Sequence, residues 1–350
     1  MSIVRVSFRI VANESRPVCT EVLPEPPERV FIGSVKSACD HLMRKAFTST
    51  GRRDHGKGMG KMSDSPILMT DSYKASHWVQ YPPDVENMYS YFESRGGRYR
   101  STVFFGLQYY LLRYLTQPIT RGHVDEADRF FSSHGEPFNR DGWEYLVDRY
   151  AGHFRVRIRA VPEGSVVPTS NVLFDIELTE PDARIFWVVS WLETLLVQVW
   201  YPTTVASLSF YCKERILEAL VQSSDDPLGE IGFKLHDFGA RGGSSQETIQ
   251  IGGAAHLVNF FGSDTVAGVL CANRYCACEM AGFSIPAAEH STITMWGRAG
   301  EEDAYANFIQ HYLVDRVVAE GTPKVAACVS DSYDIYNAIQ NLYASTRPRL

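Results

Sequence analysis

The sequence predicts an α/β fold in which a mixed α+β region is followed by strands and helices that alternate as in a β/α barrel. Four times in the second half, a short apolar run ends in polar, charged or Gly residues, and the apolar residues then take a helical period. Active-site residues of parallel α/β sheets and barrels gather at such strand ends. The four clusters are HDFGARGGSS from His236, FGSDT from Phe261, AAEHST from Ala287 and VSDSYD from Val329.

Composition places the chain among globular proteins and disfavours two classes of partner. It has 350 residues, 45% of them hydrophobic and 21% charged, with a formal net charge of −7. Residues 1–61 hold 11 Lys and Arg against 6 Asp and Glu, whereas the remainder holds 23 against 35. An acidic body without a basic stripe argues against nucleic acid as a partner. The longest apolar stretch, Phe186–Pro202, contains Glu193 and Gln198 and is too short to span a membrane.

Cysteine usage indicates a reducing compartment, and we expect a cytoplasmic protein. The count of seven is odd, and the spacing does not suggest a disulfide framework. Cys271, Cys276 and Cys278 form a cluster, which we interpret as the end of a helix because no matching His or Cys pair follows at zinc-ligand spacing. Their role stays open. The start of the chain lacks a continuous apolar segment, so no signal peptide is predicted.

Residues 1–61 differ from the rest of the chain. They contain PEPPER (Pro24–Arg29) and a Gly/Lys/Arg tract (Gly51–Lys61) without a sustained period. The acidic residues from Glu14 to Glu28 disfavour a transit peptide. We predict a flexible extension, or a gene start placed too early, with Met62 as the natural beginning.

The next region predicts a mixed α+β domain over residues 62–182. Phe104–Leu115 has the period of a packed helix, and Phe154–Pro168 alternates like a strand until it breaks at Pro162–Gly164. Ala183–Tyr201 predicts one long buried helix. We assign residues 183–343 to the first part of the barrel and residues 344–350 to a divergent tail.

The alternating region supplies the strands of that barrel. The intervals of 26, 26 and 41 positions between Phe238, Asp264, His290 and Asp331 suit βα units. A capping box is expected to begin the first helix. The predicted strands are Phe233–Gly239, His256–Phe261, Phe283–Ala287 and Lys324–Val329. The first predicted helix begins at Ser244–Glu247, and the second runs from Asp264 towards Met280. The third runs from Thr292 to Ala319, and the fourth from Tyr333 to Tyr343.

The first cluster has a chemical and a structural interpretation. Gly239 and the following glycines allow close approach of a ligand, and Arg241 between them offers a planar cation suited to phosphate. A plain tight turn explains the same residues. Phe238 is either a stacking face for a flat ring or, from its position alone, more simply a core residue.

The later clusters have similar alternatives. Asp264 is either the N-cap of the next helix or an acceptor that binds a ring carboxamide and repels a ring carboxylate. His290, between Glu289 and Ser291, is either structural or reactive. Asp331 and Asp334 could hold Mg²⁺ or bind ribose hydroxyls, and Ser330 and Asp331 could equally be helix caps.

Long stretches of the chain resemble the nicotinamide phosphoribosyltransferase family, of the type II phosphoribosyltransferases. The similarity covers residues 64–341 in register, and motifs of this length are specific. The matching segments include TDSYKASHWVQYPP from Thr70, SYFESR from Ser90, FFGLQY from Phe104, VPEGSVVPTSNVLF from Val161, WLETLLVQVWYPTTVAS from Trp191, KLHDFGARGGSSQE from Lys234, AAHLVNFFGSDTVAG from Ala254, IPAAEHSTITMWG from Ile285 and VSDSYDIYNA from Val329.

The resemblance implies an irregular β/α barrel and a pentosyltransferase of NAD salvage. Nicotinamide and phosphoribosyl pyrophosphate would give nicotinamide mononucleotide and pyrophosphate. Phe238 would stack on the nicotinamide ring, and Tyr73 of a second subunit would cover its other face, so that a homodimer is implied. Asp264 would accept from the carboxamide, and Arg241 would hold phosphate.

The resemblance also implies cofactors and supporting residues. His290 would be phosphorylated by ATP, the co-substrate, and would also contact phosphate, with Asp331 beside it and the ribose. Mg²⁺ would share the charge of the departing pyrophosphate, although its protein ligands are not identified. The supporting residues would be Asp71, His236, Asp237, Gly239, Ser284, Glu289 and Asp334.

The chain departs from the family pattern at its end. Residues after Tyr343 no longer resemble the family, and an Arg-Pro-Asp-Ser-Gly segment that contacts sugar and pyrophosphate is not found. We therefore expect an incomplete barrel and little or no turnover from residues 1–350 alone. One alternative is a form that retains only dimerisation or partial ligand binding. Another is nicotinate phosphoribosyltransferase, which Asp264 disfavours.

Overall fold

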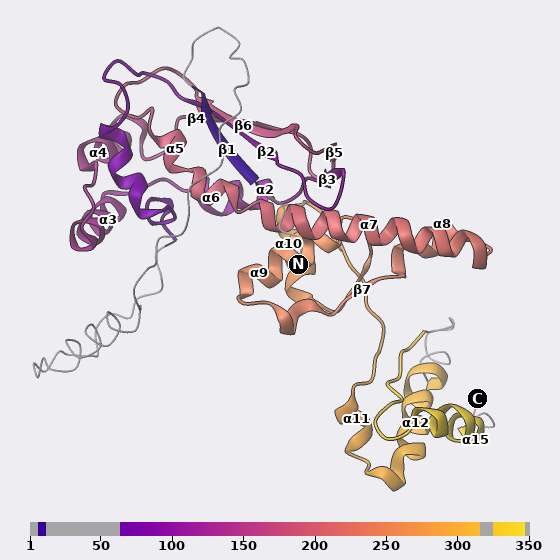
Figure 1. Ribbon diagram of the computed structural model, residues 1–350. Coiled ribbons are helices and arrows are strands. Elements are labelled where there is room, and N and C mark those ends of the chain that lie inside the picture. Colours follow the sequence, from indigo (N-terminus) through magenta and orange to yellow (C-terminus); the bar gives the residue numbers. More distant parts are fainter. Residues whose placement is uncertain (1–5, 12–63, 316–324, 347–350) are drawn as a thin grey trace, which may run out of the picture. The chain divides into compact units, whose positions relative to one another are not determined.

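A computed structural model describes residues 6–11, 64–315 and 325–346 (Figure 1). These residues form helices and strands of a mixed α/β fold and divide into two compact units. Most of residues 1–61 lies outside the described residues, so the extension predicted there stays a prediction, as do the boundaries after residues 182 and 343. Unit 1 takes the residues up to Gly97, Tyr110–Val161 and Ser170–Gln198, and unit 2 takes Arg98–Tyr109, Pro162–Thr169 and the residues from Val199 onward.

Unit 1 contains a four-stranded antiparallel sheet. Burial alternates along the second of its strands, as it does when one face covers a core. Phe92 from this strand stacks on Phe174 of the neighbouring strand, with ring centroids 4.8 Å apart. The strands, in spatial order, are β1 (Val6–Val11), β2 (Tyr89–Ser94), β6 (Val172–Leu178) and β4 (Val156–Ala160).

Helices complete unit 1 around an aromatic core. Trp143 is fully buried, and its ring centroid lies 5.0 Å from that of Trp187 and 5.2 Å from that of Trp191. Lys74 is buried as well, where its ammonium group pairs with Glu193. The elements are the 3₁₀-helices η1 (Pro66–Leu68) and η2 (Ser72–Val79), the π-helix η3 (Leu111–Leu115), and the α-helices α3 (Arg121–His134), α4 (Arg140–Tyr150), α5 (Val188–Trp191) and α6 (Glu193–Val197).

Two predictions for this region are confirmed and one is corrected. A helix does span most of Phe104–Leu115, as α2 (Leu107–Tyr110) followed by η3. The strand predicted at Phe154–Pro168 is divided in two as expected. The single helix predicted over Ala183–Tyr201 is wrong, because this buried stretch is broken into α5, α6 and the start of α7. Near Gln198 the backbone N–H bonds the carbonyl three residues earlier, which tightens the turn locally.

Unit 2 is organised around the long helix α7 (Trp200–Ser223). Helix α9 packs against both α7 and α10, and β3 pairs with β5 in a separate antiparallel ribbon. The other elements are β3 (Ser101–Val103), β5 (Val166–Pro168), α8 (Pro227–Glu230), η4 (Ile231–Phe233), β7 (His236–Asp237), η5 (Gly239–Gly242), α9 (Gln246–His256), β8 (Gly262–Ser263), α10 (Val266–Tyr275), α11 (His290–Thr294), η6 (Arg298–Gly300), α12 (Glu301–Ile309), η7 (Gln310–Asp315), α14 (Ile335–Asn337), η8 (Ala338–Leu342) and α15 (Tyr343–Thr346).

Parallel pairing occurs in very short stretches, within or directly next to the predicted strands. His236 pairs with Gly262 and Asp237 with Ser263. Single parallel bridges join Gly262 to Phe283 and Ala287 to Ala327. The order of strand, turn and helix is therefore present, and closure into a barrel stays a prediction.

The strand predicted at His256–Phe261 is wrong. Helix α9 continues to His256, and the strand pairing begins only at Gly262. The small residues near the end of α9 explain this, because they let its backbone touch α10. A Cβ atom placed on Gly268 would lie 2.6 Å from Cα of Gly253, so the two helices meet without intervening side chains.

The start of α9 is also shifted from the predicted capping box. Ser245 is the N-cap, and its hydroxyl accepts from the backbone N–H of Thr248 at 3.1 Å. Glu247 is therefore the second residue of the helix, and it does not occupy the third position that a capping box requires. None of the helices among the described residues is long and apolar enough to span a membrane.

Candidate active site

The ends of β7 and β8 are joined through Asp237. Its backbone carbonyl accepts from the N–H of Asp264 at 2.9 Å, and its carboxylate accepts from the N–H of Gly239 at 2.7 Å. The second contact closes a tight turn around Phe238. One residue thus fixes the backbone on both sides of the predicted ring-binding pair, Phe238 and Asp264.

The carboxylate of Asp264 points towards partners on the neighbouring strand ends and does not cap a helix. Ser284 donates its hydroxyl to Oδ1, and Nε2 of His236 lies 3.1 Å from the same oxygen. The N-cap of α10 is Thr265. The helix-capping alternative for Asp264 is therefore wrong, and the acceptor alternative remains.

Phe238 is a surface residue. Its side chain is 68% exposed, so the simpler interpretation as a core residue is wrong. Its ring centroid lies 4.7 Å from that of His236, with the planes tilted by 35°. An exposed aromatic face beside a carboxylate suits a flat, polar ring.

Arg241 lies in η5, three residues after Phe238, and is joined to the start of α11. Its Nη2 lies 3.2 Å from Oε2 of Glu289, and Ser291 donates to the other oxygen of that carboxylate. The Ser291 hydrogen bond and the Arg241 charge lower the pKa of Glu289. Arg241 itself is 90% exposed and can reach an anionic ligand in solution.

His290 is the first residue of α11, directly after Glu289. Its Nε2 lies 3.0 Å from Oδ1 of Asp331. Asp334 instead caps α14, because its carboxylate accepts from the N–H groups of Tyr336 and Asn337. The carboxylate for which the sequence predicts a Mg²⁺ or ribose contact is thus engaged in a helix cap, a role that the sequence did not predict for it.

The contacts connect most of the predicted residues of unit 2 in two groups. One group surrounds Asp264 and the other leads from Arg241 through Glu289 to His290. Phe238 and Arg241 belong to the same turn, so the two groups share one segment of backbone. The first group is His236, Asp237, Phe238, Gly239, Asp264 and Ser284, and the second is Arg241, Glu289, His290 and Asp331.

Asp71 and Tyr73 belong to unit 1. Asp71 is the N-cap residue of η2, and its carboxylate accepts from the hydroxyl of Thr194 at 2.7 Å. Tyr73 is exposed, with its ring centroid 5.0 Å from that of His77. Partial burial, Asp71 and Glu193 raise the pKa of Tyr73, so its phenol stays neutral at physiological pH.

Two residues near the strand ends were not predicted from the sequence. His256 is buried at the end of α9, where Nδ1 lies 3.1 Å from the hydroxyl of Ser209 and the ring stacks on Phe260. Burial lowers the pKa of His256, which keeps the ring neutral. Gly262 lies beneath His236, and a Cβ there would come within 2.6 Å of Nδ1. A Gly at a strand position was the available signal.

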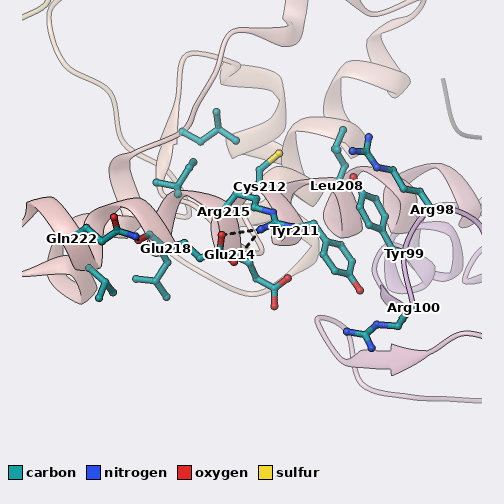
Figure 2. Close-up of a pocket in the computed structure, with 14 residues that line it drawn as sticks. Arg98, Tyr99, Arg100, Leu208, Tyr211, Cys212, Glu214, Arg215, Glu218 and Gln222 are labelled. Carbon is teal, nitrogen blue, oxygen red and sulfur yellow. Dashed lines mark hydrogen bonds and ion pairs between the residues drawn. The ribbon is translucent and has the colours of Figure 1, made fainter.

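A groove along α7 is lined by residues other than these. Its volume is about 1240 Å³, and Figure 2 shows Tyr211 of α7 beside Tyr99, with Arg215 further along the helix towards Glu218. Tyr99 stacks on Tyr211 with ring centroids 4.0 Å apart, and Arg215 pairs with Glu218 at 2.8 Å. The residues that line the groove include none of the predicted site residues.

The cysteine cluster has the location that the sequence predicts. Cys271 is buried in α10, and Cys276 is the C-cap of that helix. Burial raises the pKa of Cys271 to about 12 and that of Cys276 to about 11, so both thiols stay protonated near neutral pH. Among the residues that the structure describes, no group of three or more His, Cys, Asp or Glu is placed to hold a metal ion.

Comparison with known families identifies both parts of the chain. Residues 65–158 match the N-terminal domain of nicotinamide phosphoribosyltransferase, and residues 233–348 match the nicotinate phosphoribosyltransferase (NAPRTase) family. A nicotinamide phosphoribosyltransferase of Xanthomonas campestris pv. campestris (strain 8004) is 52% identical over 283 residues, which are 81% of this chain and 58% of that protein. One of Acinetobacter baylyi is 28% identical over 296 residues, which are 79% of this chain and 56% of that protein.

The strand-end site and these similarities place the chain among the phosphoribosyltransferases. The chain belongs to the nicotinamide phosphoribosyltransferase family. It spans 58% and 56% of the lengths of the two relatives. A crystal structure of human nicotinic acid phosphoribosyltransferase aligns with a TM-score of 0.40 and 18% identity, covering 65% of this chain and 40% of that one.

Proposed function

We propose that the protein converts nicotinamide and phosphoribosyl pyrophosphate into nicotinamide mononucleotide and pyrophosphate. The observation that carries this proposal is the pairing of β7 with β8, which brings the Phe238 turn and the Asp264 carboxylate to neighbouring strand ends. The exposed ring supplies a stacking surface, and the carboxylate supplies an acceptor. Nicotinamide presents a flat ring and an N–H donor, which match these two groups.

Asp264 also favours an amide over an acid. Its carboxylate accepts from a carboxamide N–H and repels the negative charge of nicotinate. The match of residues 233–348 to the nicotinate phosphoribosyltransferase family makes nicotinate the second candidate substrate. Selective binding of nicotinamide would separate the two.

The chemical step requires positioning and charge stabilisation more than covalent catalysis. The ring nitrogen forms a bond to C1 of the ribose, while the bond from C1 to the pyrophosphate oxygen breaks and its electron pair leaves with the pyrophosphate. Arg241 offers a fixed positive charge to a phosphate group. Phe238 and Asp264 would hold the ring at the angle of attack.

His290 and Asp331 would carry the coupling to ATP. In the tautomer with its proton on Nε2, His290 donates to Asp331 at 3.0 Å and keeps the lone pair of Nδ1 for attack. A bond from Nδ1 to the γ-phosphorus would then form as the bond to the ADP oxygen breaks. Asp331 would stabilise the cationic ring in that step.

Mg²⁺ would neutralise part of the pyrophosphate charge when bound. Such ions retain several waters and take only one or two protein carboxylates. Asp331 is exposed and fits that role, whereas the carboxylate of Asp334 is engaged in the cap of α14.

We further propose a homodimer in which Tyr73 of one subunit covers the ring that Phe238 of the other subunit stacks against. Mixing two inactive variants tests this arrangement. Subunits with Tyr73→Ala and subunits with Phe238→Ala should regain about a quarter of the wild-type sites when mixed equally, because each mixed dimer has one intact site. Recovery no greater than in the unmixed variants would contradict the shared site.

The substrate proposal is tested with residues 1–350. Nicotinamide binding is measured by calorimetry, and mononucleotide formation is measured with nicotinamide, phosphoribosyl pyrophosphate, Mg²⁺ and ATP. We expect Asp264→Asn to weaken nicotinamide binding by about tenfold or more, as loss of a charged acceptor does. Nicotinamide binding with little or no turnover is what the sequence predicts for residues 1–350 alone and would leave them a binding role, whereas absence of nicotinamide binding would refute the proposal.

A further inference from the structure

His236 contacts both residues that the proposed function assigns to the pyridine ring. Its ring centroid lies 4.7 Å from that of Phe238, and its Nε2 lies 3.1 Å from Oδ1 of Asp264. We propose that His236 is a specificity-determining residue, whose protonation sets how strongly the site prefers a neutral carboxamide over a ring carboxylate. This inference rests on the proposed function, since it concerns the same site.

The fold builds this contact across two strands. His236 pairs with Gly262 in the parallel ladder, and Asp264 follows Ser263 of the same strand. The imidazole lies over Gly262, where a Cβ would come within 2.6 Å of Nδ1. Only Gly therefore lets the ring lie over β8 and approach the carboxylate.

The consequence of protonation follows from charge. With a neutral imidazole, His236 and Asp264 together carry one negative charge, which repels a ring carboxylate. With a protonated imidazole, Nε2–H lies beside Asp264 and the pair is neutral overall. The preference for the carboxamide should therefore decrease as the pH falls through the range of about 5 to 8, where imidazoles titrate.

The other groups near His236 are held by contacts of their own or carry no charge. Asp237 follows it in β7, with its carboxylate bonded to the N–H of Gly239. His256 comes from α9, and burial lowers its pKa so that it stays neutral. Ser284 contributes a neutral hydroxyl, and Lys234 pairs with Glu230 at 2.7 Å.

Solvent screening reduces the effect of the His236 charge on ligand binding without removing it. The side chains of His236 and Asp264 are 25% and 37% exposed, so the contact is partly screened. At such a site one unit of charge a few ångströms from a ligand carboxylate changes its binding by roughly tenfold.

The experiment measures the dissociation constants of nicotinamide and nicotinate for the full chain at several pH values between about 5.5 and 8. For the wild-type protein, we expect the ratio of the nicotinate constant to the nicotinamide constant to fall about tenfold from the highest to the lowest pH. For His236→Asn, the ratio should not change with pH. The matched control is His311→Asn, which removes another His–carboxylate contact, 3.4 Å from Asp315, and should behave as the wild type does.

Two outcomes would overturn the inference while leaving the proposed function intact. One is a wild-type ratio that is constant with pH although nicotinamide binds. The other is a pH dependence that persists in His236→Asn, or in His236→Gln if the first variant fails to fold. Asp264→Asn gives an independent reading, because removal of one negative charge should lower the ratio at every pH while the dependence on pH that comes from His236 remains. Failure of the wild-type protein to bind nicotinamide would instead refute the proposed function and this inference together.

Discussion

The strands of unit 1 and those of the parallel pair in unit 2 differ in length and in what their side chains contact. In unit 1, β2 and β6 pair over five positions, and the rings of Phe92 and Phe174 stack in a buried core. In unit 2, β7 and β8 pair over two positions, and the side chains at their ends are partly exposed. Long buried strands stabilise the fold, whereas short strand ends present polar groups to a ligand. Stability and chemistry should therefore respond to different substitutions.

The largest effect is expected in the core of unit 1. Trp143→Ala removes a fully buried ring that contacts Trp187 and Trp191, and it should lower the free energy of unfolding by about 3–5 kcal/mol. Chemical denaturation measures this change. Phe130→Ala is the control, because that ring is half exposed and should cost much less. Equal losses from the two variants would contradict the assignment of the core.

A smaller loss of stability, with a larger loss of binding, is expected at Asp237. Asp237→Ala removes the acceptor of the Gly239 N–H and should lower the free energy of unfolding by about 1 kcal/mol. It should also weaken nicotinamide binding by about tenfold, since the Phe238 turn loses its constraint. Asp226→Ala removes a similar acceptor, 3.0 Å from the N–H of Gly229 in α8, and should leave binding unchanged. Unchanged nicotinamide affinity in Asp237→Ala would show that the turn holds its shape without the carboxylate.

The smallest effect is expected at Glu163, whose oxygens accept from the N–H groups of Gly106 and Gln108. Burial raises the pKa of Glu163, and these hydrogen bonds oppose the shift only in part. The folded protein then binds the proton more tightly than the unfolded chain does, so this contribution to stability is present at acidic pH and is lost as the pH rises through the folded pKa.

Glu163→Gln should therefore remove that decline and lower the free energy of unfolding at neutral pH by about 1 kcal/mol, because only one oxygen of Gln can accept from the two N–H groups. Denaturation of the wild-type protein and the variant, from about pH 4.5 to 7, gives the difference. The exposed Glu218→Gln is the control and should show no such pH dependence in its difference from the wild type. A difference between Glu163→Gln and the wild type that grows towards acidic pH in favour of the variant would reverse the predicted sign.

The sequence predicts the general fold better than it predicts individual elements. Alternation along Phe154–Pro168 survives in β4, where half-buried and exposed positions alternate, and the break at Pro162 separates β4 from β5. The apolar run His256–Phe261 does not form a strand, since a short apolar run fits a buried helix end equally well. The contact of Gly253 with Gly268 favours a helix at the end of α9. Because it joins residues of two different helices, the periodicity of apolar residues along one segment does not reveal it.

The sequence predicts the residues of the candidate site better than it predicts which of them contact one another. The strand-end clusters and the family resemblance named Asp264 and His290, and the structure gives each a partner, Ser284 and Asp331. The exposure of Phe238 could not be read from its place at the end of an apolar strand. The position of Gly262 beneath His236 depends on strand register, which spacing along the chain does not fix.

The glycine contact between α9 and α10 has a consequence for how this protein tolerates variation. Gly253 and Gly268 touch backbone to backbone, so a larger residue has no side chain to displace and can be accommodated only by moving a whole helix. Helix α10 begins two residues after Asp264 and would shift that carboxylate with it. A residue larger than Gly at either position should thus displace Asp264 and disturb the site, although neither position carries a reactive group.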